Sequence, residues 1–210
     1  MWGRGEPMAR DTNPEGVPLT VWLVTPAGDD PNHGAARRRR LAALVLDAYC
    51  PPGGVTADFA PGRGEVLAAA TATGRSAIAL LPSPLCQGRP PASLRDLRDR
   101  ADLAVALPPE SHLGPLRPHP LSSAAVDALA RRAELVLRPG GMFVVGTVAA
   151  ASSRDVVAES IEAATCRGLG YFQHVVAFVA PEVTAADAAP TDEDRRVGHV
   201  DLLAFVRGSR

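Results

Sequence analysis

The chain has 210 residues, of which 46% are hydrophobic and 21% are charged, and this size and composition are typical of one ordinary globular domain. The formal net charge is −1, so the chain lacks the basic excess of a dedicated nucleic-acid-binding protein, and any such contact would have to be local. No apolar run approaches the roughly 20 residues that span a bilayer, so we expect a cytoplasmic protein without a membrane segment.

The N-terminal quarter of the chain predicts a tail, a strand and a helix. Residues 1–18 are polar and rich in glycine and proline, which indicates a flexible tail before a single domain over 19–210. Residues 19–25 form a β-rich run. Residues 35–49 carry apolar side chains at helical spacing, and two prolines and two glycines at 51–54 end this helix.

The central part of the chain alternates between apolar runs and helical patterns. We expect strands over 55–59, 76–81 and 102–107, and helices over 65–73 and 93–100. The first of these strands ends in an acid and passes through a Gly-x-Gly loop into its helix. An open α/β sheet receives a nucleotide-type cofactor at such a place, so the sequence predicts a ligand site at this loop.

The C-terminal part continues the same alternation and then breaks it. We expect a helix over 122–137, a tight turn at 138–141 into a strand over 142–147, a helix over 154–167, and strands over 172–179 and 199–206. No helical pattern separates the last two strands, so they should form a hairpin whose terminal strand is antiparallel and lies at an edge. The predicted fold class is therefore α/β: a Rossmann-like, mostly parallel sheet with flanking helices and an antiparallel C-terminal hairpin strand.

The run of four arginines and the three cysteines can both be interpreted without a ligand site. The run Arg37-Arg38-Arg39-Arg40 falls at the start of the first helix, and we interpret it as the solvated face of that helix. The three cysteines lie far apart and lack the paired spacing of a metal site, so we expect no metal.

Five stretches, taken in order, resemble the Rossmann-like class I S-adenosylmethionine-dependent methyltransferases. They are the Asp-Phe-Ala-Pro-Gly-Arg-Gly loop at 58–64, the strand and Pro-Pro-Glu at 101–110, the Leu-Arg-Pro-Gly-Gly-Met turn at 137–142, and the closing strand pair at 173–178 and 199–205. Within that class the chain looks most similar to the DNA amino-methyltransferases. The order of residues 48–64, a helix followed by Pro-Gly and a strand into the glycine loop, carries that finer resemblance, and the stretch Gly-Arg-Ser-Ala-Ile at 74–78 resembles their entry into the second strand.

The resemblance implies a cofactor, S-adenosylmethionine, and two sets of site residues. The residues implied to hold the cofactor are Asp58, Phe59, Ala60, Gly62 and Gly64. The residues implied to form the substrate lip, at the position of the family's catalytic motif, are Leu107, Pro108, Pro109 and Glu110. His112 and His119 flank the proline-rich loop over the expected cleft, and each is more readily explained as a solvated side chain.

Each of the loop residues also has an interpretation that needs no ligand. Asp58 could cap the glycine turn or the following helix. Gly62 and Gly64 could be required only by a turn with positive φ, and Phe59 and Pro61 could simply fill that turn.

Three departures from the family pattern leave a second function open. No acid stands near 80–82, where the family binds the cofactor ribose, and Leu107 and Glu110 replace the polar and aromatic residues that flank Pro-Pro in DNA methylases. No inserted target-recognition domain is present. The alternative is therefore a catalytically inactive binding or regulatory module with the same fold. A nicotinamide-dependent oxidoreductase is a weaker third interpretation, because Leu67 stands where its third glycine would be.

Overall fold

The computed structural model describes seven stretches of the chain, and all structural statements below concern them. They are residues 11–12, 18–25, 33–80, 94–109, 122–148, 154–179 and 198–209.

Eight strands and four helices make up these stretches. The strands are β1 (Asp11–Thr12), β2 (Pro18–Val24), β3 (Val55–Asp58), β4 (Ser76–Ala79), β5 (Ala101–Ala106), β6 (Leu137–Val148), β7 (Leu169–Val179) and β8 (Gly198–Arg207). The helices are α1 (His33–Tyr49), α2 (Glu65–Ala72), α3 (Ser123–Val136) and α4 (Arg154–Thr165). No helix in the described stretches is long and apolar enough to cross a membrane.

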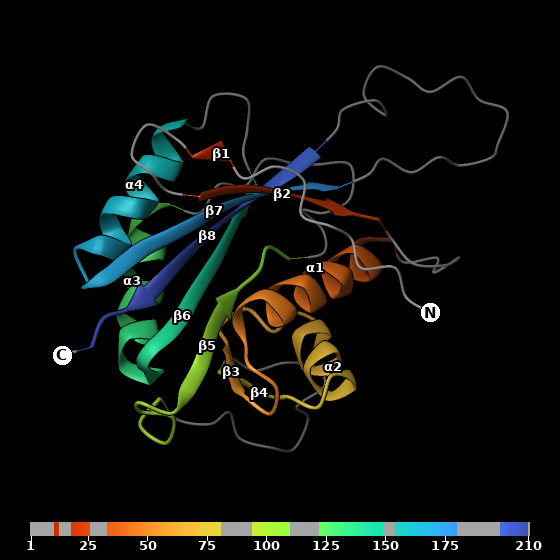
Figure 1. Ribbon diagram of the computed structural model, residues 1–210, viewed down its shortest axis with the longest axis horizontal. Coiled ribbons are helices and arrows are strands. Elements are labelled where there is room, and N and C mark those ends of the chain that lie inside the picture. The colour runs from red at the N-terminus through yellow and green to blue at the C-terminus, as the bar shows by residue number, and fades with distance from the viewer. Residues whose placement is uncertain are drawn as a thin grey trace, which may run out of the picture.

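All eight strands form one sheet in the order β1-β2-β7-β8-β6-β5-β3-β4 (Figure 1). β4, β3, β5 and β6 are parallel to their neighbours in that series, and β2 is parallel to β7. β8 is antiparallel to both β6 and β7. The predicted α/β fold with an antiparallel C-terminal hairpin strand is confirmed.

The predicted position of the last strand at an edge is wrong, because β8 lies inside the sheet between β6 and β7. Its side chains explain this position. Val200, Leu202 and Ala204 are buried in the core on one face of the sheet, and Leu203 and Phe205 are buried on the other. A strand that is apolar on both faces needs to be covered on both faces. A strand inside the sheet lies beneath the helices that pack on each face, so this position provides that cover.

The helices cover the two faces of the sheet in pairs (Figure 1). Leu41 of α1 and Val66 of α2 belong to the core on one face. Ala133 of α3 and Ala164 of α4 belong to the core on the other face, where Phe205 is fully buried. These two apolar layers hold the sheet between the helix pairs and fix the ends of β3 and β5 in place.

Three predicted elements differ from the structure. Residues 94–100 form turns rather than a helix. The predicted turn at 138–141 lies within β6 as a bulge, because Leu137 pairs with Ala101 whereas Met142 pairs with Leu103. Asp11–Thr12, inside the predicted tail, pairs with β2; residues 1–10 and 13–17 of that tail lie outside the described residues.

Candidate functional site

The glycine loop connects β3 to α2 at the carboxyl edge of the sheet. β3 ends at Asp58 and α2 begins at Glu65, and between them the Gly64 amide donates to the Pro61 carbonyl at 2.7 Å. Gly62 and Gly64 have φ values of 52° and 92°, a backbone conformation that residues with a side chain rarely adopt. The predicted strand, glycine turn and helix are therefore all present, and the turn itself requires both glycines.

Three amide groups of this loop already have hydrogen-bond partners within the protein. The bonds run from Phe59 N to Val105 O at 2.9 Å, from Ala60 N to Asp58 Oδ1 at 3.0 Å and from Arg63 N to Glu65 Oε2 at 3.1 Å. Glu65 also places a carboxylate in the first turn of α2, where an anion would otherwise be favoured. A dinucleotide site presents free amides to a pyrophosphate at this point, so the geometry disfavours the oxidoreductase interpretation.

We use the word crevice for the space beside this loop at the carboxyl ends of β3 and β5, where the strand order starts to run in opposite directions. β4 flanks β3 on one side, and β5 followed by β6 flanks it on the other. Open α/β sheets bind ligands outside the carboxyl ends of their strands at such a switch point. The topology therefore assigns the candidate ligand site to the space between the loop after β3 and the residues after β5.

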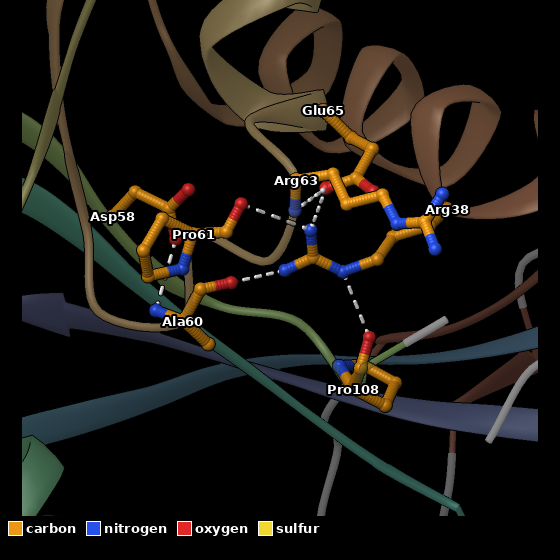
Figure 2. A network of polar contacts seen from close by, with 7 residues as sticks. All are labelled: Arg38, Asp58, Ala60, Pro61, Arg63, Glu65 and Pro108. Atoms are coloured by element: carbon orange, nitrogen blue, oxygen red, sulfur yellow. Dashed lines mark hydrogen bonds and ion pairs between the residues drawn. The ribbon is translucent and has the colours of Figure 1, made fainter. Parts of the chain in front are cut away.

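The guanidinium group of Arg38 fills this crevice (Figure 2). Arg38 extends from α1, and its side chain is fully buried. Its Nε donates to the Pro108 carbonyl at 2.9 Å and its Nη1 to the Pro61 carbonyl at 3.4 Å. Nη2 donates to the Ala60 carbonyl, and Nη1 also forms an ion pair with Glu65 Oε2. One side chain thus connects α1, the glycine loop, α2 and the segment after β5.

Asp58 lies at the end of β3 behind this network (Figure 2). Its side chain is only 2% exposed, and burial raises the pKa of the carboxyl group to about 6 from its ordinary value of 3.8. The hydrogen bond from the Ala60 amide and the positive charge of Arg38 act in the opposite direction. The predicted alternative role of Asp58, capping the glycine turn, is present in the Ala60 contact.

The four residues of the predicted substrate lip have different surroundings. Leu107 is buried in the core on the α1 face. Pro108 is buried and gives its carbonyl to Arg38, whereas Pro109 is exposed. Glu110 lies outside the described residues, as do His112 and His119. Of the three described lip residues, the structure therefore brings only Pro108, through its backbone carbonyl, into the crevice.

The described residues do not fit S-adenosylmethionine as they stand. A Cβ added at Gly62 would clash with Arg38 Nη1 and lie 2.8 Å from Glu65 Oε2, so the space beside the glycine loop is already filled. The residues at and after the end of β4 are Ala79 and Leu80, and neither can bind a ribose hydroxyl through its side chain. A ligand of this size can enter the crevice only after Arg38 has moved.

A second polar cluster lies on the opposite face of the sheet. His174 Nε2 is 2.9 Å from Asp201 Oδ1, and His199 Nε2 is 3.6 Å from Asp201 Oδ2. Asp201 alternates with Leu203, which packs in the core beneath α3 and α4, whereas Arg38 extends from α1 on the other side. The two histidines, predicted to be structural, therefore do not face the crevice.

Comparisons with known proteins identify the fold. No protein-family description and no curated protein matches the chain. A chain from the complex between the Haloferax volcanii Trm112 methyltransferase activator and a protein designated a methyltransferase matches with a TM-score of 0.59 and 18% identity, over 86% of this chain and 94% of that chain. The fold is that of the class I methyltransferases.

Two further solved structures support the same fold. A TehB-like S-adenosylmethionine-dependent methyltransferase from Corynebacterium glutamicum has a TM-score of 0.53 and 17% identity, over 85% of this chain and all of that chain. The 1,6-didemethyltoxoflavin-N1-methyltransferase of Burkholderia thailandensis, with bound S-adenosylhomocysteine, has a TM-score of 0.52 and 17% identity, over 81% and 78% of the two chains. Identities this low establish a shared methyltransferase fold and no shared activity.

Sequence reasoning missed Arg38, although the sequence contains a signal for it. The interpretation of the arginine run as a solvated face is wrong for Arg37 and Arg38, which are buried, while Arg39 and Arg40 are exposed. Arg38 stands three residues before Leu41, which is buried on the stripe of α1 that faces the sheet. Extending that stripe backwards by one helical turn would have placed Arg38 on the buried side.

Proposed function

We propose that this chain is a methyltransferase-like protein that binds S-adenosylmethionine at the crevice between β3 and β5 when Arg38 has withdrawn. The observation that carries the proposal is the set of carbonyl oxygens of Ala60, Pro61 and Pro108, which meet at this crevice. These oxygens accept hydrogen bonds, so they suit the ammonium group of an amino-acid-like cofactor better than a phosphate. The methyltransferase fold supports the same choice of cofactor.

The residues that the sequence implied as cofactor ligands would contribute in different ways. The carbonyl of Ala60 would accept from the cofactor, and Gly62 would let its backbone approach closely. Asp58 and Gly64 would hold the shape of the loop. The side chain of Phe59 is buried in the core beneath α3 and α4, so its contribution would be structural. The cofactor itself carries an activated methyl group, and a protein then has chiefly to align the acceptor.

Calorimetry with S-adenosylmethionine and S-adenosylhomocysteine tests this proposal. We expect binding in the micromolar to millimolar range by the wild-type protein, and its loss in Asp58→Ala and Gly62→Val. Circular dichroism of both variants is the control that they are folded. A folded wild-type protein that binds neither compound at millimolar concentration would contradict the proposal.

A second candidate function, a catalytically inactive module with the methyltransferase fold, has observations of its own. Arg38 fills the crevice, Leu107 is buried where a polar residue would hold a methyl acceptor, and β4 is not followed by an acid. Saturable methyl transfer to any acceptor would exclude this candidate.

The finer relation to DNA methylases remains a proposal from the order of residues 48–64 and from the second-strand entry at 74–78. Enzymes that modify a base hold its amino group with a polar side chain and stack an aromatic ring on the flipped base. Leu107 and Glu110 supply neither group, and the net charge of −1 gives no general attraction to DNA. We therefore propose methylation of a small molecule ahead of methylation of DNA, with a methyl-transfer assay on double-stranded DNA as the direct comparison.

A further inference from the structure

We infer that the crevice between β3 and β5 is a receptor for a cationic group, and that Arg38 is its built-in occupant, which any cationic ligand has to displace (Figure 2). Where the ligand is S-adenosylmethionine, this inference rests on the proposed function. Where the ligand is a simple guanidinium or ammonium ion, it does not.

The rim of the crevice consists of hydrogen-bond acceptors. The Arg38 guanidinium is surrounded by the carbonyl oxygens of Ala60, Pro61 and Pro108 and by Glu65 Oε2. Two of the three carbonyls belong to prolines, which have no N–H group to offer a ligand. A group that donates several hydrogen bonds and carries a positive charge therefore satisfies this rim, and an anion does not.

The charges around the crevice require a cation in it. The side chains of Asp58 and Glu65 are 2% and 4% exposed, and the fully buried Arg38 forms an ion pair with Glu65. Removing that charge without replacement would leave the buried Glu65 carboxylate without its ion pair and would remove the Arg38 hydrogen bonds to the carbonyls of Ala60 and Pro108. The Pro61 carbonyl would keep its bond from the Gly64 amide. The folded protein therefore keeps the crevice filled by its own side chain when no other cation is there.

Arg38 and a cofactor would compete for the same place. The guanidinium stands against Gly62, the residue whose missing side chain creates the space beside the loop. Arginine is joined to α1 by a flexible stem, so it can leave by rotation about side-chain bonds while the helix stays in place. A site that is open for only a fraction of the time shows an apparent affinity reduced by that fraction. If the crevice is open for about a tenth of the time or less, removing Arg38 raises the affinity about tenfold or more.

The first experiment tests the receptor without any cofactor, using Arg38→Ala and methylguanidinium chloride. We expect the variant to unfold at a lower Tm than the wild-type protein, and millimolar methylguanidinium to raise that Tm saturably at constant ionic strength, because a bound ion stabilises the folded state. The wild-type protein and Arg40→Ala should show no such rise, since Arg40 is an exposed arginine on the same helix and leaves the crevice filled. No saturable rise in Arg38→Ala, or an equal rise in all three proteins, would overturn the inference.

The second experiment measures S-adenosylmethionine binding by calorimetry in the same three proteins. We expect Arg38→Ala to bind at least about tenfold more tightly than the wild-type protein, and Arg40→Ala to bind as the wild-type protein does. If Arg38→Ala does not fold, Arg38→Lys serves instead, because lysine keeps the charge but lacks the planar fork and so holds the crevice less firmly. Weaker binding in the variant would mean that Arg38 is a ligand of the cofactor, and it would overturn the inference.

The two experiments separate this inference from the proposed function. Stabilisation of Arg38→Ala by methylguanidinium, with no cofactor binding in any variant, supports the cation receptor and contradicts the methyltransferase proposal. Cofactor binding that is equal in all variants, with no effect of methylguanidinium, supports the choice of cofactor in the proposed function and overturns the inference that Arg38 competes with a ligand for the crevice.

Discussion

Asp58→Asn should remove a pH dependence of stability that the buried carboxyl group imposes on the wild-type protein. Burial raises the pKa of Asp58 to about 6 in the folded state, against 3.8 for an exposed aspartate. Between these two pH values the folded protein holds a proton that the unfolded chain releases, so its free energy of unfolding falls as the pH rises. A pKa difference of one corresponds to about 1.4 kcal/mol, so the whole decline is about 3 kcal/mol. The stabilisation is complete below pH 3.8 and is lost once the pH has risen through about 6.

The assay is denaturant unfolding of the wild-type protein and Asp58→Asn at closely spaced pH values from 4 to 7. The asparagine keeps an oxygen that can accept from the Ala60 amide, so the variant removes the titration and retains the turn. Subtracting the two curves of unfolding free energy against pH cancels the groups that titrate equally in both proteins. Across this pH range the difference should change by most of the expected decline of about 3 kcal/mol. A flat difference for Asp58→Asn would refute the argument that burial controls this carboxyl group.

Two further predictions concern stability and use paired variants measured by denaturant unfolding. Gly62→Ala should lower the free energy of unfolding by about 2 kcal/mol more than Gly74→Ala does. Both glycines have positive φ, but of the two added methyl groups only the one at Gly62 displaces the Arg38 guanidinium from its charged hydrogen bonds. Equal costs would contradict the filled crevice. Phe205→Ala should cost about 3–5 kcal/mol, because this ring is fully buried in β8. Phe172→Ala, whose side chain is 48% exposed in β7, should stay within about 0.5 kcal/mol of the wild-type protein, and a large loss there would show that β7 is covered on that side.

The sequence predicted the elements of this fold well because most of them bury simple apolar patterns. The run Asp-Leu-Ala-Val-Ala-Leu at 102–107 became β5, and the helical stripe in 122–137 became α3. The interior position of β8 was missed because hairpin reasoning considers only the neighbour in sequence, β7. The additional neighbour, β6, is separated from β8 by a whole helix and strand along the chain. The apolar character of 200–205 on both faces was the local signal for an interior strand.

The position of the candidate site was predictable from the sequence, but the side chain that fills it was not. Asp58 and the glycines at 62 and 64 predicted a turn at the carboxyl end of a strand, and the structure contains this turn. The contact that fills the site joins residues 22 to 70 positions apart, from Arg38 to Ala60 and to Pro108. Local patterns do not identify such distant partners, so Arg38 was interpreted as solvated, as the following Arg39 and Arg40 are in the structure.

The place of β8 in the sheet has a consequence for the order in which the domain assembles. Among the described strands, β1, β2 and β7 pair with the other four only through β8, so the sheet consists of two blocks and one strand that connects them. β2 pairs with β7 across more than 150 residues of sequence, and this long-range closure is slow compared with local contacts. The block of β3, β4, β5 and β6 can assemble first, and β7 acquires its place only when β8 inserts. In amide exchange, β2 and β7 should therefore open together with β8 as one cooperative unit, while the strands that carry the crevice remain protected.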